Sequence, residues 1–261
     1  MDLGLRGRRA LITGGSRGIG FAVAEALAAE GAAVGLVARD AAGLVTAAGR
    51  LGSRGVPVAT AAADVTDTPA LRRAVTEIAS ALGGLDHLVA NAGGTVGTGN
   101  LTSAADDEFT ATFALNAGHA VELIRAGRPQ LQAAGGGAVV IISSITGMRP
   151  APRTAYAAAK AAEIHLAATA AQELAPDRIR VNAVSPGSIM FPGGGWDSFQ
   201  RANPDDFAAF VVGQFPYRRL GSLPEVADVV AFLLSERASW ITGANIVVDG
   251  GQNYPSARRF S

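Results

Sequence analysis

The chain has 261 residues, 49% of them hydrophobic, and its 22 basic and 22 acidic residues cancel. Without a basic stretch, this balance argues against nucleic acid or an anionic membrane as a main partner. The chain contains no cysteine, which excludes disulfides and thiol catalysis. No segment approaches the ~18 consecutive apolar residues that span a bilayer, and the N-terminus is a poor signal peptide. These features predict a soluble, cytoplasmic protein.

Short apolar segments alternate with longer helical patterns along the whole chain. The expected strands are rich in β-branched residues and nearly free of polar alternation, as in strands buried on both faces: 9–13, 33–38, 56–62, 85–90, 138–143, 179–184 and 245–248. The helical patterns between them are 18–29, 41–51, 69–82, 105–134, 154–174 and 224–234. This alternation predicts an α/β fold, a doubly wound parallel sheet with helices on both faces, and a single domain over residues 1–261.

A glycine-rich loop, TGGSRGIG at 13–20, lies between the first expected strand and the first helix. Gly14, Gly18 and Gly20 can adopt backbone angles closed to other residues and let the main chain approach a ligand closely. The following helix presents free N–H groups and a positive dipole end, which suit a pyrophosphate. A glycine-rich turn without a ligand is the alternative. The place of the loop at the first strand–helix junction favours dinucleotide binding.

Tyr156 and Lys160 stand four positions apart in YAAAK, which places both on one face of a helix. A free tyrosine has a pKa near ~10, and a neighbouring ammonium favours the phenolate and lowers that value. Such a phenol can exchange a proton with a carbonyl oxygen near neutral pH. The alternative is a pair of ordinary surface residues.

The spacing G-x-x-x-G-x-G together with YAAAK resembles the short-chain dehydrogenase/reductase family, in particular its 3-oxoacyl-ACP reductase-like branch. The likeness extends from the first strand to ITGANIVVDGG near the end of the chain. It implies a Rossmann-like fold and a catalytic set in which Ser144 binds the substrate oxygen, Tyr156 transfers the proton, Lys160 assists the phenol, and Asn116 supports a proton relay from a distorted helix. Ser143 stays a second candidate for the serine, because the stretch from Ser144 to Tyr156 is slightly shorter than in many members.

The resemblance also implies a set of residues that bind a nicotinamide dinucleotide. Tyr156 and Lys160 would contact it as well, the latter at the nicotinamide ribose. The remaining expected contacts are Gly14, Ser16, Arg17, Gly18, Ile19, Gly20, Arg39, Asp64, Val65, Asn91, Ala92, Gly93, Pro186, Gly187 and Ile189.

Two arginines bear on which dinucleotide binds. Ala38 occupies the position where NAD-dependent members usually carry an acid, and Arg39 follows it, while Arg17 lies in the glycine loop. A guanidinium donates two parallel hydrogen bonds to a phosphate. We therefore predict NADP (NADPH) as the preferred cofactor. NAD is the alternative, if both arginines face solvent or Asp40 pairs with one of them, and Asp64 could equally cap a turn.

The segment 189–221 breaks the strand–helix rhythm with an aromatic cluster and a triple glycine. Long insertions of this kind are uncommon unless functional, so we predict a mobile substrate lid. An ordinary packed excursion is the alternative. Trp196, Phe199, Phe207 and Phe210 would either line a substrate pocket or anchor the lid.

The three histidines lack metal-ligand spacing, so no metal site is expected. The predicted partners are a small-molecule carbonyl or alcohol substrate and, from the resemblance, other copies of the chain in a homotetramer or dimer. The terminal YPSARRFS, 254–261, would reach a neighbouring subunit or fray. The expected function is hydride transfer between NADP and a carbonyl or secondary alcohol, such as a 3-oxoacyl thioester. An NAD-dependent alcohol dehydrogenase and a non-catalytic nucleotide sensor are the alternatives.

Overall fold

The computed structural model describes residues 2–257, so the end of the expected subunit contact, 258–261, lies outside the described residues. These residues form one sheet of seven parallel strands in the order β3-β2-β1-β4-β5-β6-β7. The strands are β1 (Arg9–Thr13), β2 (Ala33–Ala38), β3 (Val58–Ala62), β4 (His87–Ala90), β5 (Gly137–Ile142), β6 (Ile179–Pro186) and β7 (Asn245–Val248). The predicted doubly wound α/β fold is therefore confirmed.

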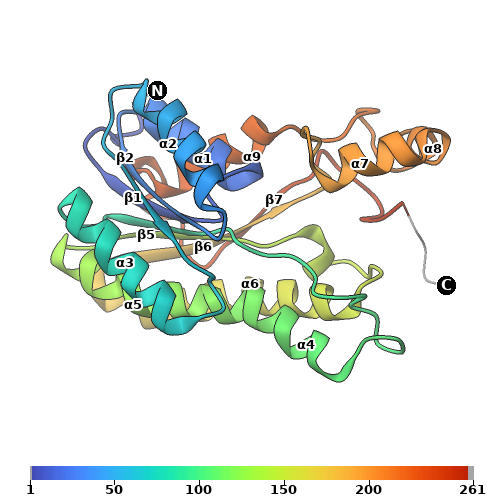
Figure 1. Cartoon of the computed structure of the whole chain (residues 1–261), viewed down its shortest axis with the longest axis horizontal. Helices are drawn as coiled ribbons and strands as arrows, with labels where there is room; N and C mark the ends of the chain where they lie inside the picture. The colour runs from blue at the N-terminus through green and yellow to red at the C-terminus, as the bar shows by residue number, and fades with distance from the viewer. Residues whose placement is uncertain (1, 258–261) are drawn as a thin grey trace.

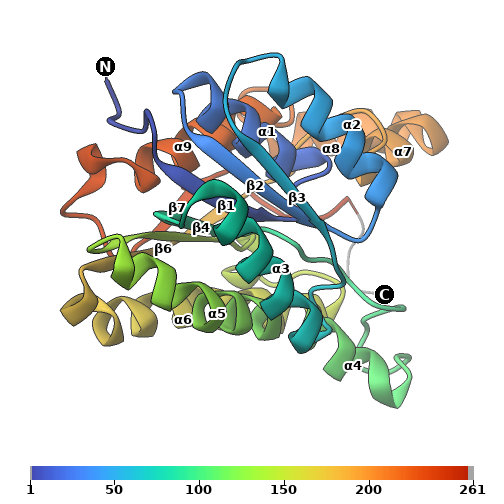
Figure 2. The same cartoon turned by 60° about the vertical axis from the view of Figure 1, so that its left-hand side comes forward.

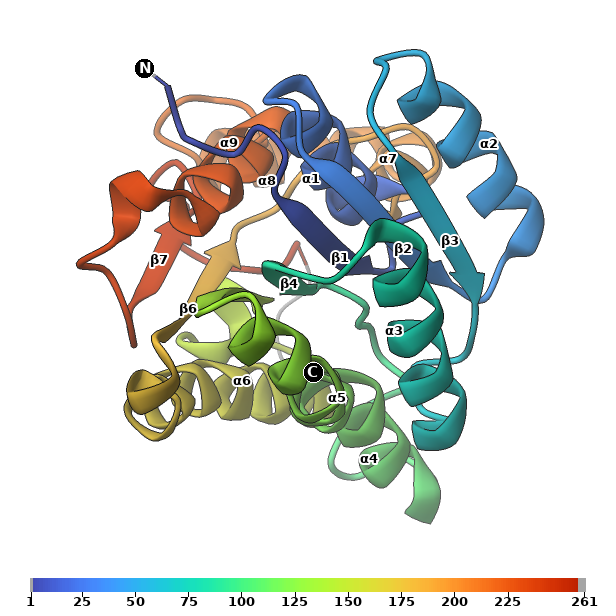
Figure 3. The same cartoon turned by 90° about the vertical axis from the view of Figure 1, so that its left-hand side faces the viewer.

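Helices cover both faces of the sheet (Figures 1 and 2). One layer consists of α1 (Gly18–Ala29), α2 (Ala41–Gly52) and α9 (Leu223–Leu234). The opposite layer consists of α3 (Thr68–Leu82), α5 (His119–Ala133) and α6 (Thr154–Glu173), with α4 (Asp106–Phe113) beside α6. Figure 3 shows the two layers above and below the strands. Each layer buries its own cluster of aliphatic side chains against the sheet, which explains why the strand sequences are apolar on both faces.

The strand order reverses between β1 and β4. The chain winds outward from β1 to β3 and then returns to β4 on the other side of β1, with Ala10 opposite His87 and Ile12 opposite Val89. In open parallel sheets, ligands bind in the crevice at the carboxyl ends of the strands where the order reverses. The glycine loop follows β1 at that crevice, as its sequence position predicted.

Several element boundaries differ from the sequence-based prediction. Strand β3 begins at Val58 instead of 56, next to Pro57, which has no N–H to donate to the ladder. The single helix predicted over 105–134 is divided into α4 and α5 by a π-helical turn, η1 (Ala114–Gly118). Short 3₁₀ turns complete the fold at η2 (Ile145–Gly147), η3 (Ala175–Asp177) and η4 (Glu236–Ala238).

Residues 189–221 contain two helices that the sequence did not predict, α7 (Gly195–Ala202) and α8 (Pro204–Gln214). They project beyond the carboxyl ends of the strands (Figure 1). The excursion leaves and rejoins the body at one place, where Ile189 forms an isolated bridge with Gly221. No helix of residues 2–257 combines the length and apolarity needed to cross a membrane. Within the same residues no group of acidic, histidine or cysteine side chains could hold a metal ion.

Candidate active site

The glycine loop fits closely against the end of β4. A Cβ added at Gly20 would lie 2.4 Å from Asn91 Nδ2 and 2.5 Å from the Gly14 oxygen, so no side chain fits there. The Asn91 side-chain amide donates to the Thr13 oxygen at 2.9 Å and thereby joins the ends of β1 and β4. Gly14 and Gly18 have positive φ angles of 65° and 58°, which favour glycine.

The first turn of α1 suits an anion. Its N-cap residue, Arg17, is extended and makes no side-chain cap, and the turn contains no acidic residue. The N–H groups of the helix end are therefore oriented toward the crevice without a competing carboxylate, and the helix dipole favours negative charge. A dinucleotide pyrophosphate fits this arrangement.

The ends of β2 and β3 carry Arg39 and Asp64. Arg39 is 76% exposed, and its Nη1 lies 3.9 Å from Asp64 Oδ2, so Arg39 approaches Asp64 and not Asp40. Asp64 Oδ1 accepts hydrogen bonds from the backbone and hydroxyl of Thr66 at 2.9 and 2.7 Å. The backbone N–H of Thr66 is the main cause that holds the pKa of Asp64 below its usual value. Asp64 thus caps a turn and still presents its second oxygen.

Tyr156 and Lys160 meet the glycine loop in a small cavity of about 160 Å³. Ile19 of the loop lines it together with Asn91, Gly93, Ile142, Ser143, Ser144, Tyr156, Lys160, Pro186 and Gly187. A larger cavity of about 950 Å³ shares Ser144, Tyr156 and Gly187 with it. These three residues therefore stand at the boundary between the small cavity beside the glycine loop and the larger one.

The remaining predicted residues line neither cavity. Ser16 lies near Asp40 in front of α2. Val65 is buried beneath α3, and Ala92 packs against the same core. Ile189 is buried at the base of the 189–221 segment, where only its main chain could contact a cofactor.

Lys160 is the only lysine in the chain, and its side chain is 3% exposed. The ammonium donates to the Ile142 oxygen at 2.9 Å and lies 5.5 Å from the centre of the Tyr156 ring. Its third partner is the buried Glu163, at 3.1 Å to Oε1 and 2.9 Å to Oε2. Burial opposes the charged amine, but Glu163 and Tyr156 outweigh it and raise the pKa of Lys160 above its ordinary value.

Asn116 occupies the π-helical turn η1, the helix distortion that the family resemblance implied. It is fully buried and donates through Nδ2 to the Gly94 oxygen at 2.8 Å and the Thr112 oxygen at 2.7 Å. A Cβ at Gly93 would lie 2.7 Å from Asn116 Oδ1 and 3.0 Å from Lys160 Nζ. Glycine at position 93 therefore leaves room for the asparagine and the lysine to approach each other.

The two adjacent serines have different partners. The Ser143 hydroxyl is buried and donates to the Lys160 main-chain oxygen at 2.7 Å. Ser144 Oγ accepts from the Thr146 N–H at 3.2 Å, which leaves its proton available to another acceptor. Ser144 also lines both cavities, whereas Ser143 lines only the smaller one. This geometry favours Ser144 as the serine that faces a substrate.

His119 lies beneath the site. Its Nδ1 is 2.9 Å from both the Leu115 and Asn116 oxygens, which assigns the ring proton to Nδ1, and Nε2 is 3.1 Å from Thr13 Oγ1. Burial and the Lys160 ammonium lower the pKa of His119 to about 4. The imidazole is therefore a neutral support that connects the end of β1 to η1.

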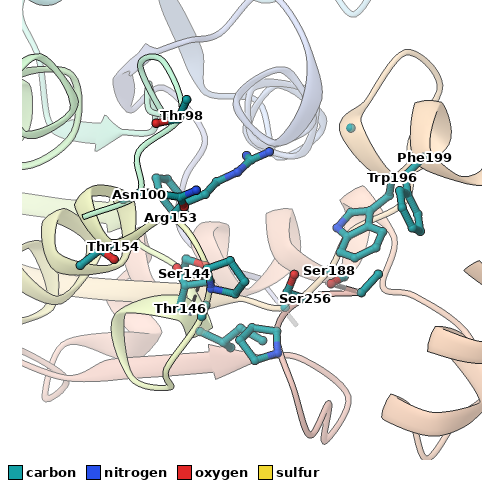
Figure 4. A pocket seen from close by; sticks show the side chains of 18 of the residues that line it. Thr98, Asn100, Ser144, Thr146, Arg153, Thr154, Ser188, Trp196, Phe199 and Ser256 are labelled. Carbon is teal, nitrogen blue, oxygen red and sulfur yellow. Dashed lines mark hydrogen bonds between the residues drawn. The ribbon is translucent and has the colours of Figure 1, made fainter. Parts of the chain in front are cut away.

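The larger cavity is lined mainly by polar side chains, as Figure 4 shows. Trp196 and Phe199 of α7 form one wall, and the opposite wall contains Thr98, Asn100, Ser144, Thr146, Arg153 and Thr154. Arg153 is the only charged residue among the described residues that line it. Its backbone is in the left-handed region, with φ 71°.

The aromatic residues of the 189–221 segment divide between the two expected roles. Trp196 stacks on Phe210 with ring centres 4.6 Å apart and meets the Phe199 ring edge-on at 5.8 Å. Phe210 and Phe207 belong to a separate small core under α7 and α8. Trp196 therefore connects this core to the cavity wall.

Sequence reasoning missed Glu163, Arg153, Thr98, Asn100, Ser188 and Ser256. Glu163 could have been found, because positions 156, 160 and 163 follow the i, i+4, i+7 spacing of one helix face. The cavity residues carry no such signal, because they come from loops that only the fold brings together.

Comparisons with known proteins agree with this geometry. The family profile described as Enoyl-(Acyl carrier protein) reductase matches residues 14–253. The 3-oxoacyl-[acyl-carrier-protein] reductase FabG of Salmonella typhimurium is 36% identical over 95% of this chain and 98% of its own length.

Solved structures extend the likeness to the fold. L-sorbose reductase from Gluconobacter frateurii, complexed with NADPH and L-sorbose, superposes with a TM-score of 0.90 at 36% identity, over 97% of this chain and 98% of that one. A 7α-hydroxysteroid dehydrogenase complexed with NADH and 7-oxo glycochenodeoxycholic acid also gives 0.90, at 29% identity over 98% of both chains. Similar chains thus use either nicotinamide cofactor on very different substrates.

Proposed function

Because the chain belongs to the short-chain dehydrogenase/reductase family and is an oxidoreductase with an NAD(P)-binding fold, we propose that it transfers hydride between NADP and a polar carbonyl or secondary alcohol. The observation that carries the proposal is the small cavity in which Ile19 of the glycine loop lies with Ser144, Tyr156 and Lys160. A phosphate-binding loop and a proton-transfer group share one crevice there.

The chain's own residues would divide the chemistry as follows. The cofactor supplies or accepts the hydride. Ser144 donates a hydrogen bond to the substrate oxygen and holds it beside Tyr156, whose phenol gives the oxygen a proton during reduction and removes it during oxidation. Lys160 stabilises the phenolate and binds the nicotinamide ribose. Asn116 fixes the distorted helix turn from which a water-mediated relay would return the proton.

The preference for NADP is supported by Arg17 and Arg39. Both side chains are exposed, and Ala38, which precedes Arg39, offers no carboxylate to a ribose 2′-hydroxyl. Of the two nearby acids, Asp40 directly follows Arg39 in the chain, and Asp64 has its Oδ1 occupied by Thr66. Fluorescence titration tests the preference: NADPH should bind at least about tenfold more tightly than NADH, and tighter NADH binding would reverse it.

The substrate is proposed to be a small polar ketone or alcohol. The hydroxyls and amide of the larger cavity can hydrogen-bond a hydroxylated compound, and Trp196 can cover its apolar face. L-sorbose, bound by the Gluconobacter enzyme, is of this class. A long 3-oxoacyl chain would leave these polar groups without partners, so only short 3-oxoacyl thioesters suit the cavity.

Tyr156→Phe tests the function as a whole. Proton transfer by a positioned side chain accelerates a reaction by about 10²–10⁴-fold, so turnover should fall by that factor while NADPH affinity stays unchanged. The assay is nicotinamide absorbance over a panel of hydroxyketones, polyols and short 3-oxoacyl thioesters with both cofactors. A nucleotide sensor would bind NADPH and turn over no compound of the panel.

We propose that the segment 189–221 acts as the lid of this cavity. We also propose that the chain assembles as a tetramer or dimer in the cytoplasm. Light scattering of the purified protein measures the assembly. Limited proteolysis of the segment should slow when cofactor and substrate are both bound, and equal cleavage in all states would contradict a lid.

A further inference from the structure

A buried carboxylate stands directly behind the proposed catalytic lysine. Glu163 is 1% exposed, lies three positions after Lys160 on α6, and places both carboxylate oxygens within 3.1 Å of its ammonium. Among the described residues, Glu163 Oε2 accepts no hydrogen bond and is ion-paired with this ammonium, while the Ser143 hydroxyl also acts on the carboxylate. The other buried positions of α6 are alanines. Burying an ion pair at this depth carries a large desolvation penalty. Apolar side chains of similar volume would stabilise the fold at least as well, so stability alone does not explain the pair.

The three groups form a line along one face of the helix. Tyr156 and Glu163 are seven positions apart, about 10 Å along the axis, and Lys160 lies between them. The ammonium therefore has a phenol on one side, with the ring centre 5.5 Å away, and a carboxylate on the other. Because Coulomb energy falls with the inverse of distance, the carboxylate offsets roughly half of the ammonium's effect on the phenol.

The surroundings add one further titratable group. Burial and the Lys160 ammonium lower the pKa of His119, on α5, to about 4, so its imidazole is neutral at assay pH. The turns η1 and η2 and the strands β5 and β7 carry no ionisable side chain. Other ionisable side chains on the elements that pack against α6 are exposed or bonded elsewhere: Asp106, Asp107, Glu108 with Thr98, Asp177 with Arg128, and Arg180 with the carbonyls at the end of α9.

We propose that Glu163 is a positioning residue that anchors Lys160 and, by balancing its charge, sets the pH at which Tyr156 exchanges its proton. The inference rests on the proposed oxidoreductase function. It adds Glu163 to Tyr156 and Lys160 as a third ionisable group of the site. Without the carboxylate, the full ammonium charge would act on the phenol, and the phenolate would form at lower pH.

The test is Glu163→Gln, which keeps the shape and removes the charge. In the alcohol oxidation direction, which needs the phenolate, the acid limb of the kcat/KM profile should move about one pH unit lower. Glu163→Asp keeps the charge and should stay near the wild-type midpoint. Glu173→Gln removes an exposed carboxylate from the same helix and is the matched control. An unchanged midpoint, or one moved to higher pH, overturns the proposal.

A second readout does not need turnover. Because Lys160 is the only lysine, [¹³Cε]lysine labelling gives one side-chain NMR signal whose shift reports its ionisation. Its midpoint should lie above the free value of ~10.4 in the wild type and fall in Glu163→Gln. Equal midpoints would overturn the proposal even if Glu163→Gln fails to turn over. If the midpoints differ as expected and the wild type reduces no carbonyl, the proposed function fails while the ion pair stands.

Discussion

The crevice around the glycine loop and the cavity beside α7 are built in opposite ways. The crevice is defined largely by main chain, namely glycines 14, 18 and 20 and the open first turn of α1, with the Asn91 side-chain amide joining β1 to β4. The cavity is defined by side chains from loops, with Trp196 connected to a small core of its own.

This difference teaches where specificity resides in the chain. A phosphate is recognised by N–H groups and a helix end, which almost any sequence supplies once glycines permit the approach. A substrate is recognised by hydroxyl, amide and guanidinium groups whose identity depends on the loops. The first region therefore identifies the family, and the second is the region proposed to select the substrate. Substitutions that add one heavy atom should be severe in the crevice and mild in the proposed lid.

Gly20→Ala should have the largest effect. The added Cβ would lie 2.5 Å from the Gly14 oxygen and 2.4 Å from Asn91 Nδ2, and neither can move without breaking the β1–β4 connection. We expect NADPH to bind roughly 100-fold more weakly, about 3 kcal/mol, as measured by fluorescence titration.

Gly213→Ala is the matched substitution in the proposed lid, segment 189–221. No atom lies within 4 Å of the added Cβ, and the residue is exposed within α8. The free energy of unfolding should rise by about 0.5–1 kcal/mol, since alanine favours the helix, and NADPH affinity should not change. Equal losses of affinity in both variants would refute the contrast between the two regions.

Acid should destabilise the body of the fold through two buried histidines, His87 of β4 and His119 of α5. The segment 189–221 contains no histidine, so this effect does not arise there. Burial lowers the pKa of His87 to about 4, and burial and Lys160 do the same for His119. Because unfolding restores the ordinary value of ~6.5, their full contribution is present above that pH and is lost as pH falls toward 4. The loss is roughly 3 kcal/mol for each histidine, measurable by urea unfolding at several pH values.

His87→Leu isolates one of these contributions. Among the described residues, neither ring nitrogen of His87 has a hydrogen-bond partner, so leucine removes a buried polar group as well as the acid sensitivity. The pH slope of the unfolding free energy should decrease by about half. The exposed His165 provides the control substitution, His165→Gln. If the pH slope were the same in His87→Leu and in the wild type, His87 would not be a source of the acid sensitivity.

The sequence predicted the crevice in more detail than the segment 189–221. Helix α1 and strands β1, β2 and β7 agree with their predicted ranges residue for residue, because glycines and charged residues flank their aliphatic runs. The π-helical turn at Asn116 was missed as an element, since its sequence reads as a continuous helix.

Helices α7 and α8 and the polar cavity wall could not be derived in this way. Residues 195–214 hold two glycines, a proline and mixed polar residues with no clear period. They fold as α7 and α8 because Phe210, Phe215 and Leu220 form a core that exists only in three dimensions. Glu163 was recoverable in principle, but a carboxylate three residues from a lysine normally indicates an exposed helix pair, and burial comes only from the fold.

Trp196→Ala tests the proposed substrate cavity separately from the cofactor crevice. The change removes one stacked and one edge-on ring contact, each worth about 0.5–1.5 kcal/mol, and opens the cavity wall. We expect KM for the substrate to rise about tenfold while the Kd of NADPH stays constant. Trp240, the other tryptophan, is 99% exposed, and Trp240→Ala should change neither constant. If Trp196→Ala raised the Kd of NADPH more than the KM for substrate, Trp196 would act on the cofactor crevice and not on the substrate cavity.

Substitutions of Arg153 should have the smallest effect and test the cavity most specifically. Arg153 is charged, and its backbone at the cavity wall is in the strained left-handed region. Arg153→Gln removes the only charge among the described lining residues, so KM should rise a few-fold for ketones that carry a carboxylate and stay unchanged for neutral hydroxyketones. Arg153→Gly removes the same charge and also relieves the left-handed backbone, so it should repeat the KM effect and raise the Tm. If the two variants differ in KM, the backbone and not the guanidinium determines selectivity. If both raise KM equally for charged and neutral ketones, Arg153 shapes the cavity without reading substrate charge.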